Sequence, residues 1–157
     1  MAQTAIAKHS GKPVGQYGDW KLIDCDTCGF IHVNPLPTPE ALSEVYDEKF
    51  YANDKPDYLT KYETEQDYWC QAVYRRRFDT FENLVEHQGE KSILDIGCSG
   101  GFFLRYGNQR GWKVTGIEPS KQAADYARNV SKIDVIEDYF QNVNWQDYRE
   151  AFDVIHL

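Results

Sequence analysis

The stretch Lys91–Leu104 reads KSILDIGCSGGFFL, and it decides the fold of this 157-residue chain. Within it, Ile93–Ile96 form a short and mostly apolar run, which predicts a buried β-strand. The run leads into a turn in which Gly97, Gly100 and Gly101 leave almost no side chains, and a helical apolar pattern follows. Glycine lets a backbone approach a ligand closely, and a helix N-terminus offers free N–H groups. We therefore expect the backbone of this turn to be a binding surface.

Strand and helix patterns alternate downstream of the turn. Strands are expected at Ile93–Ile96, Trp112–Ile117, Ile133–Ile136 and Phe152–Leu157. Helices are expected between them, at Phe102–Arg110 and Lys121–Asn129. Short connections between alternating strands and helices are typical of a parallel α/β sheet with right-handed crossovers.

The chain divides by composition into three regions. They are an N-terminal tail with a Cys-containing β region at 1–45, an aromatic helical segment at 46–89, and an α/β half-domain at 90–157. In the first region, short strands at Trp20–Asp24 and Phe30–Val33 flank a Cys-x-x-Cys turn, and the first residues of the chain are expected to form a loose tail. In the second, apolar residues recur at helical spacing over Tyr62–His87.

Composition and charge exclude several classes of protein. The net charge is -8, from 17 Lys and Arg against 25 Asp and Glu, so the chain is a poor electrostatic partner for nucleic acid. The mean hydropathy of -0.66 and the absence of a long apolar run predict no membrane span. We see no secretory signal, and the 4 cysteines are not spaced as a disulfide framework. A cytoplasmic protein with reduced thiols is therefore expected.

Two acids stand at strand ends beside the glycine-rich turn. Glu118 follows the second expected strand, where a carboxylate can accept hydrogen bonds from both hydroxyls of a ribose. Dinucleotide-binding fingerprints place such an acid about 20 residues after their glycines. However, Ser99 interrupts the G-x-G-x-x-G pattern, and Asp95 would repel a pyrophosphate at the end of its strand. A cationic ligand tolerates Asp95 better than a nicotinamide dinucleotide does.

The sequence LDIGCSGGFFL resembles the first motif of class I S-adenosylmethionine-dependent methyltransferases, (D/E)-x-G-x-G-x-G. Asp95, Gly97 and Gly101 match that motif, and Ser99 stands in place of its middle glycine. The resemblance covers about residues 90 to 157. It implies a Rossmann-like class I methyltransferase sheet, here the N-terminal half with about four parallel strands, preceded by a small β-turn and helical region. It also implies S-adenosylmethionine as the cofactor.

The same resemblance assigns residues to the cofactor site. GIEPS resembles the second motif, with Glu118 as the ribose acid, and IEDYF lies where the family places residues around adenine. Asp138 would then bond the adenine amino group, and Tyr139 or Phe140 would pack on the ring. The expected cofactor-binding residues are Asp95, Gly97, Cys98, Ser99, Gly101, Phe102, Glu118, Pro119, Asp138, Tyr139 and Tyr51.

Tyr51 enters this set through the aromatic segment. Tyr46, Phe50 and Tyr51 correspond to tyrosines that suggest a lid over the cofactor in related enzymes. Aromatic faces attract a sulfonium by cation–π interaction, which gives the lid a physical basis. A cluster that only packs in the core is the alternative.

The turn DCDTCGF has the spacing of a zinc knuckle, but structural zinc requires four N or S ligands. Residues 25–51 resemble the N-terminal part of certain sugar or small-molecule methyltransferases, in which two such knuckles occur, and the first is missing here. We therefore expect no bound metal, with Cys25 and Cys28 as the zinc candidates. His9 and His32 are further donors in an irregular set, and the alternative is a β-turn with two free thiols.

The resemblance implies an S-adenosylmethionine-dependent methyltransferase that acts on a small-molecule or sugar-type acceptor by in-line transfer. No residue is predicted as a catalytic base. The family sheet has seven strands and this sequence ends on the fourth, so we expect either a piece of a longer enzyme, inactive alone, or a module that binds cofactor without an acceptor site. A NAD-dependent oxidoreductase is a further alternative. An unpaired edge on the fourth strand predicts self-association, whereas no nucleic-acid or membrane partner is expected.

Overall fold

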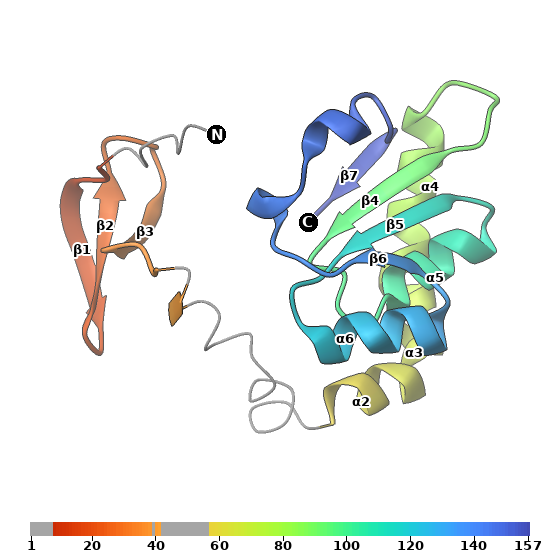
Figure 1. Ribbon diagram of the computed structural model, residues 1–157, viewed down its shortest axis with the longest axis horizontal. Coiled ribbons are helices and arrows are strands. Elements are labelled where there is room, and N and C mark those ends of the chain that lie inside the picture. The colour runs from red at the N-terminus through yellow and green to blue at the C-terminus, as the bar shows by residue number, and fades with distance from the viewer. Residues whose placement is uncertain (1–7, 39, 42–56) are drawn as a thin grey trace. The chain divides into compact units, whose positions relative to one another are not determined.

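The computed structural model describes residues 8–38, 40–41 and 57–157. The chain divides into two compact units, Met1–Val45 and Tyr46–Leu157, and each unit has its own sheet (Figure 1). The expected helical segment and the expected half-domain thus lie in the same unit.

The first unit contains a three-stranded antiparallel sheet in the order β1-β2-β3. Its strands are β1 (Gly11–Tyr17), β2 (Trp20–Cys25) and β3 (Ile31–Asn34). Strands β2 and β3 lie within one residue of the predicted strands, whereas β1 was not predicted. Six of its seven residues are exposed, so β1 has no alternating apolar pattern and is held by its pairing with β2.

The second unit is built on a parallel four-stranded sheet in the order β6-β5-β4-β7. Its strands are β4 (Ser92–Ile96), β5 (Lys113–Ile117), β6 (Asp134–Ile136) and β7 (Val154–His156). All four correspond to expected strands, and the α/β fold class is confirmed.

The strand order sets the place of the site. From β4 the chain moves outward to β5 and β6 and then returns to add β7 on the other side of β4. In open parallel sheets, ligands bind at the carboxyl ends of the strands where the order reverses in this way. The carboxyl ends of β4 and β7, with the neighbouring end of β5, are therefore the expected binding edge.

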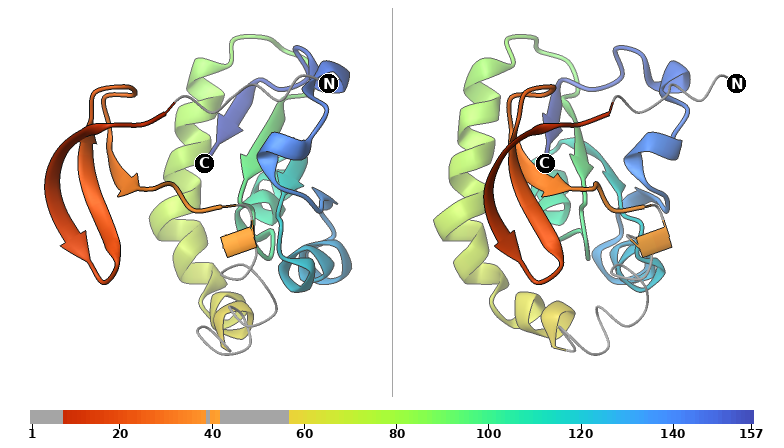
Figure 2. Two further views of the ribbon diagram at one scale, coloured as in Figure 1. Left: turned by 60° about the vertical axis from the view of Figure 1, so that its left-hand side comes forward. Right: turned by 90° about the vertical axis from the view of Figure 1, so that its left-hand side faces the viewer.

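Helices connect and cover the strands. They are α2 (Tyr58–Thr64), α3 (Gln66–Trp69), a π-helical turn (Cys70–Tyr74), α4 (Arg75–Leu84), α5 (Phe102–Gln109), α6 (Lys121–Tyr126) and a second π-helical turn (Ala127–Ser131). Figure 1 shows α4 and α5 behind the sheet, and Figure 2 shows α4 running along its side. The single helix expected over Tyr62–His87 is thus a series of segments that starts four residues earlier and ends before Val85, which is extended.

Aromatic rings fill the space between α4, α5 and the sheet. The fully buried ring of Phe78 lies 4.8 Å from that of Phe103 and 5.6 Å from that of Trp112. A Cβ added at Gly107 would lie only 2.4 Å from Phe78 Cζ. Gly107 therefore lets α5 approach α4 closely enough for Phe78 to occupy the centre of the core.

Among the described helices, none is long and apolar enough to cross a membrane.

Candidate cofactor-binding site

The glycine-rich turn joins β4 to α5 and has alternating left-handed residues. φ is 81° at Gly97, 50° at Ser99 and 73° at Gly101. The backbone N–H groups of Gly97 and Cys98 donate to the carbonyl of Ile117, at 2.8 and 3.0 Å. These bonds hold the turn against the end of β5, so its backbone lies at the binding edge of the sheet.

Glu118 binds the turn from the end of β5. Its Oε2 accepts a hydrogen bond from Ser99 N at 2.9 Å, and its Oε1 accepts one from Ser120 N at 2.8 Å. The side chain is buried, and burial raises the pKa of this carboxyl against the lowering effect of the two backbone donors, with nearby Asp95 raising it further. Each oxygen keeps a second lone pair, so the fixed carboxylate can still accept bonds from a ligand.

Asp95 lies near the carboxyl end of β4, between the neighbouring strands β5 and β7. It is 5% exposed and pairs in register with Gly116 of β5 and His156 of β7. His156 Nδ1 lies 2.6 Å from Asp95 Oδ1, while Arg77 Nη1 donates to His156 Nε2 at 2.6 Å. The contacts from Arg77 to His156 and from His156 to Asp95 fix the orientation of the Asp95 carboxylate. His156 was not among our expected site residues, because only the strand register reveals the pair.

Helix α2 packs against the turn. A Cβ at Gly100 would lie 2.8 Å from Leu59 Cδ2, so the two segments are in close contact. The same helix begins with Tyr58, which lies beside the site and forms a hydrogen bond with Ser99. Burial raises the pKa of Tyr58 and the charge of Glu118 raises it further, whereas the bond with Ser99 lowers it. Sequence reasoning missed Tyr58. The signal was its place in the aromatic segment, whose named lid residues, Tyr51 included, lie outside the described residues.

Asp138 and Tyr139 follow β6, so they lie after the carboxyl end of a third strand. Asp138 Oδ1 accepts hydrogen bonds from Tyr139 N and from Asn142 Nδ2, both at 2.7 Å. The carboxylate is therefore engaged within its own loop. Phe140 is 45% exposed and its ring lies 4.7 Å from that of Trp145. The loop thus offers a half-buried acid and aromatic surface at the expected edge.

Two of the expected residues turn their side chains into the core. Cys98 is buried, and a Cβ added at Gly116 would lie 2.4 Å from its Sγ, so the thiol fills the space that this glycine leaves. Burial, and then the charge of Asp95, raise the pKa of Cys98. The ring of Phe102 lies 5.5 Å from those of both Tyr62 and Tyr126. Cys98 and Phe102 can therefore face a ligand only through their backbone, and Pro119 serves as the spacer between Glu118 and Ser120.

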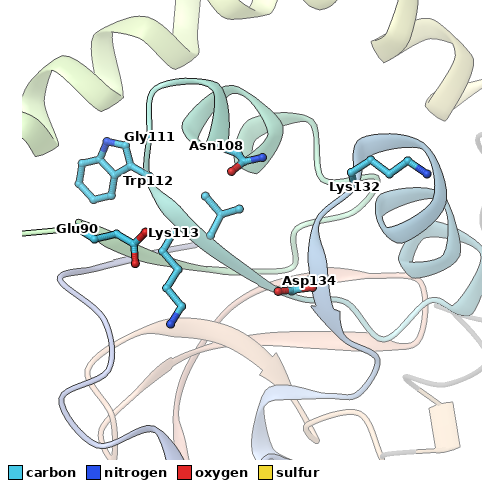
Figure 3. Close-up of a pocket in the computed structure, with 8 residues that line it drawn as sticks. Glu90, Asn108, Gly111, Trp112, Lys113, Lys132 and Asp134 are labelled. Atoms are coloured by element: carbon cyan, nitrogen blue, oxygen red, sulfur yellow. The ribbon is translucent and has the colours of Figure 1, made fainter.

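A pocket of about 410 Å³ lies elsewhere on the second unit. It is lined by Lys113 and Asp134, the first residues of β5 and β6, together with Trp112 and Lys132 (Figure 3). These are the amino ends of the strands, opposite to the edge that carries the glycine-rich turn. The pocket is therefore not part of the candidate cofactor site.

The Cys-x-x-Cys turn belongs to the first unit. Sequence reasoning treated Cys25 and Cys28 as an incomplete ligand set, but the structure brings His9 and His32 next to them. Burial would raise the pKa of the Cys25 thiol, but hydrogen bonds from the Cys28 backbone and from His32 outweigh it and lower the pKa to about 5.

A parallel sheet with a glycine-rich turn and a buried acid at adjacent strand ends defines a Rossmann-like cofactor-binding protein. The family described as Methyltransferase domain matches residues 63–157, and the chain belongs to that family. No curated protein matches the chain.

Solved structures similar to this chain include the plantazolicin methyltransferase BpumL in complex with SAH. It is 25% identical with a TM-score of 0.46, over 66% of this chain and 40% of that chain. BpumL with a monoazolic desmethylPZN analog and SAH is 27% identical, with a TM-score of 0.44 and the same coverage. A SAM dependent methyltransferase from Archaeoglobus fulgidus is 21% identical with a TM-score of 0.35, over 60% of this chain and 38% of that chain. The chain thus spans well under half the length of these proteins.

Proposed function

We propose that the second unit binds S-adenosylmethionine and forms the cofactor half of a methyl-transfer site. The observation that carries the proposal is the closure of the glycine-rich turn on Glu118, through the bond from Ser99 N to Glu118 Oε2. It combines open backbone with a fixed acceptor, as an adenosine ligand requires. Membership of the methyltransferase-domain family and the SAH in the BpumL structures support it.

Each group at the edge has a role that follows from its chemistry. Glu118 would accept hydrogen bonds from the two ribose hydroxyls, and the backbone of Gly97–Gly101 would let the ligand approach without steric hindrance. Asp95 supplies negative charge for the ammonium and sulfonium groups at the amino acid end of the ligand. Tyr58 adds an aromatic surface next to Ser99. When bound, S-adenosylmethionine supplies an electrophilic methyl group on a positive sulfur.

For the acceptor, we propose a small molecule or sugar-type compound, on the basis of the N-terminal resemblance noted above. Catalysis would then rest on alignment of the acceptor atom with the methyl group. A module that binds cofactor without transferring methyl is the second candidate. Among the described residues that lie next to Asp95 and Glu118, none stands out as a base for the acceptor.

The test of cofactor binding is calorimetric titration of the chain with S-adenosylhomocysteine and, in parallel, with NAD. Glu118→Ala should weaken S-adenosylhomocysteine binding by about 5- to 150-fold, since about 1–3 kcal/mol is lost when buried polar partners are removed. Asp134→Ala is the matched control, because Asp134 lies at the amino end of β6. Binding of NAD alone, or equal affinity in both variants with unchanged circular dichroism, would overturn the proposal.

Methyl transfer is tested separately, by the release of S-adenosylhomocysteine from S-adenosylmethionine in the presence of a panel of sugar nucleotides and small metabolites. Turnover supports the enzyme, and tight cofactor binding without any turnover supports the module.

We also propose that the chain associates through β7. This strand is at an edge of the sheet, and its Ile155 is 59% exposed. Unpaired edge strands pair with other chains, and a charge placed on the edge prevents this. Light scattering should show dimers or larger species that Ile155→Lys reduces. A wild-type chain that stays monomeric at high concentration would refute the association.

A further inference from the structure

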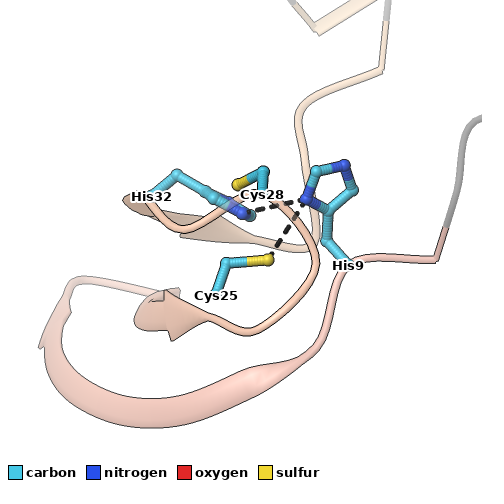
Figure 4. Close-up of side chains that lie close together, drawn as sticks. All are labelled: His9, Cys25, Cys28 and His32. Carbon is cyan, nitrogen blue, oxygen red and sulfur yellow. Dashed lines mark hydrogen bonds between the residues drawn. The ribbon is translucent and has the colours of Figure 1, made fainter.

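Four side chains with metal-binding atoms meet at one end of the first unit (Figure 4). His9 precedes β1, Cys25 ends β2, Cys28 lies in the following turn, and His32 lies in β3. One ligand atom from each of the four lies within 4.8 Å of all the others. Residues separated by up to 23 positions are thus brought together by the pairing of three strands.

The spacing of these atoms fits a tetrahedral ion. His9 Nδ1 lies 3.1 Å from His32 Nε2 and 3.3 Å from Cys25 Sγ. Bonds of about 2.3 Å from zinc to sulfur and about 2.0–2.1 Å to nitrogen put the corners of a tetrahedron roughly 3.3–3.8 Å apart. The observed separations of the four atoms, which are at most 4.8 Å, are close to these values, so small side-chain movements would let them surround one ion.

His32 is held in the orientation that a metal ligand requires. His32 Nδ1 donates to the carbonyl of Val33 at 2.7 Å, which places the ring proton on Nδ1 and leaves the lone pair of Nε2 facing the cluster. Metal-binding histidines are typically oriented by such a bond from the other ring nitrogen. A histidine that only packed against the sheet would not need it.

The backbone holds the other ligands in place. Gly29, with a φ of 75°, closes the Cys turn through a bond from its N–H to the carbonyl of Cys25 at 2.8 Å. The segment with His9 is attached to the same turn, because Asp26 N donates to the carbonyl of Ser10 at 2.9 Å. Both flanks of the cluster are therefore fixed by hydrogen bonds that do not use the ligand atoms.

We propose that His9, Cys25, Cys28 and His32 form a structural zinc site. Two thiolates and two neutral imidazoles suit zinc, and their charge of −2 neutralises the ion. Both cysteines bind the metal as thiolates, so any proton still held by a thiol is released to solvent when the metal binds. Four protein ligands leave no open position, so the role of the ion is to stabilise the fold.

The small core of this unit explains why it would need an ion. Among its described residues, only Ile23 and Cys25 are buried. A sheet of this size buries too little apolar surface to be stable alone, and small domains of this kind commonly depend on a metal.

The test is the metal content of the purified 157-residue chain, followed by removal of the ion with a chelator and titration with cobalt. We expect one zinc per chain and, with cobalt, the visible absorption of a tetrahedral ion with thiolate charge-transfer bands in the near ultraviolet. Chelation should lower the melting temperature, and added zinc should restore it.

Variants identify the ligands. Cys28→Ser and His32→Gln should each weaken cobalt binding by more than about 100-fold, beyond the roughly 10–100-fold effect of changing a group that only orients a ligand. Cys70→Ser and His87→Gln are the matched controls in the second unit and should leave the titration unchanged. A wild-type chain that binds neither zinc nor cobalt overturns the site, as does equal binding by ligand and control variants. These readouts do not depend on cofactor binding by the second unit.

Discussion

Asp95 of β4 and His156 of β7 are direct neighbours in the parallel register, and Asp95 Oδ1 lies 2.6 Å from His156 Nδ1. The imidazole stands between this buried carboxylate and the exposed guanidinium of Arg77. The contact therefore joins two strands at the edge where we place the cofactor.

Replacing His156 with Ala should destabilise the second unit by about 1–3 kcal/mol, because Asp95 is left buried without this partner. Arg77→Ala should cost less than about 1 kcal/mol, since Arg77 is exposed. Urea unfolding of the two variants measures the difference. Equal losses would show that the Asp95–His156 contact contributes little beyond an ordinary surface interaction.

Glu118 predicts a pH dependence of stability. Its pKa is raised in the folded chain, mainly by burial, so the native state holds this proton at a pH where the unfolded state has lost it. Stability is then fully present below the usual pKa of a glutamate, about 4.3, and falls as pH rises through the folded value. The free energy of unfolding of the wild type, minus that of Glu118→Gln, should decrease from acidic to neutral pH. A difference that is constant or increases with pH would refute the assignment.

Ser99 has a φ of 50°, a conformation in which a side chain is strained and glycine is not. Ser99→Gly should change the free energy of unfolding by no more than about 1 kcal/mol. Relief of backbone strain stabilises this variant, whereas the greater freedom of glycine in the unfolded chain and the lost bond with Tyr58 destabilise it. Ser99→Val should lower it by about 1–3 kcal/mol, since a β-branched residue is least suited to this region. Thermal melts of both variants measure the two effects, and a more stable Val variant would contradict the prediction.

Gly107 and Phe78 are coupled through the core. A Cβ at Gly107 would overlap the Phe78 ring, so Gly107→Ala should destabilise the chain. Overpacking should cost about 1–3 kcal/mol, and the higher helix propensity of alanine should offset up to about 1 kcal/mol of that cost. The same change in a Phe78→Leu background should cost less, because the smaller side chain frees the space. A double-mutant cycle by chemical denaturation checks the coupling, and strictly additive effects would count against it.

Local patterns were enough to predict the parallel sheet and to point to the turn and the acid of the candidate site. The apolar runs, the glycines after β4 and the acid after β5 each act over a few residues, so the sequence shows them directly. Strand β1 escaped prediction because its residues are almost all exposed, and only pairing with β2 makes it a strand.

The parts of the site that depend on distant residues could not be predicted. The Asp95–His156 contact joins residues 61 positions apart, and it follows from strand register rather than from any motif. In the first unit, the sequence named His9 and His32 as further donors, but they meet only because β1 and β3 flank β2. Tyr58 was one of many aromatic residues in its segment until helix α2 placed it beside Ser99.

The filling of the Gly116 gap by Cys98 has a consequence for how relatives of this chain can diverge. A larger residue at position 116 would displace the sulfur, and with it the start of the turn that Cys98 belongs to. A change at either position is therefore tolerated only with a compensating change at the other. Among homologous chains, the sizes of these two residues should vary inversely, so that their combined volume stays nearly constant while each identity drifts.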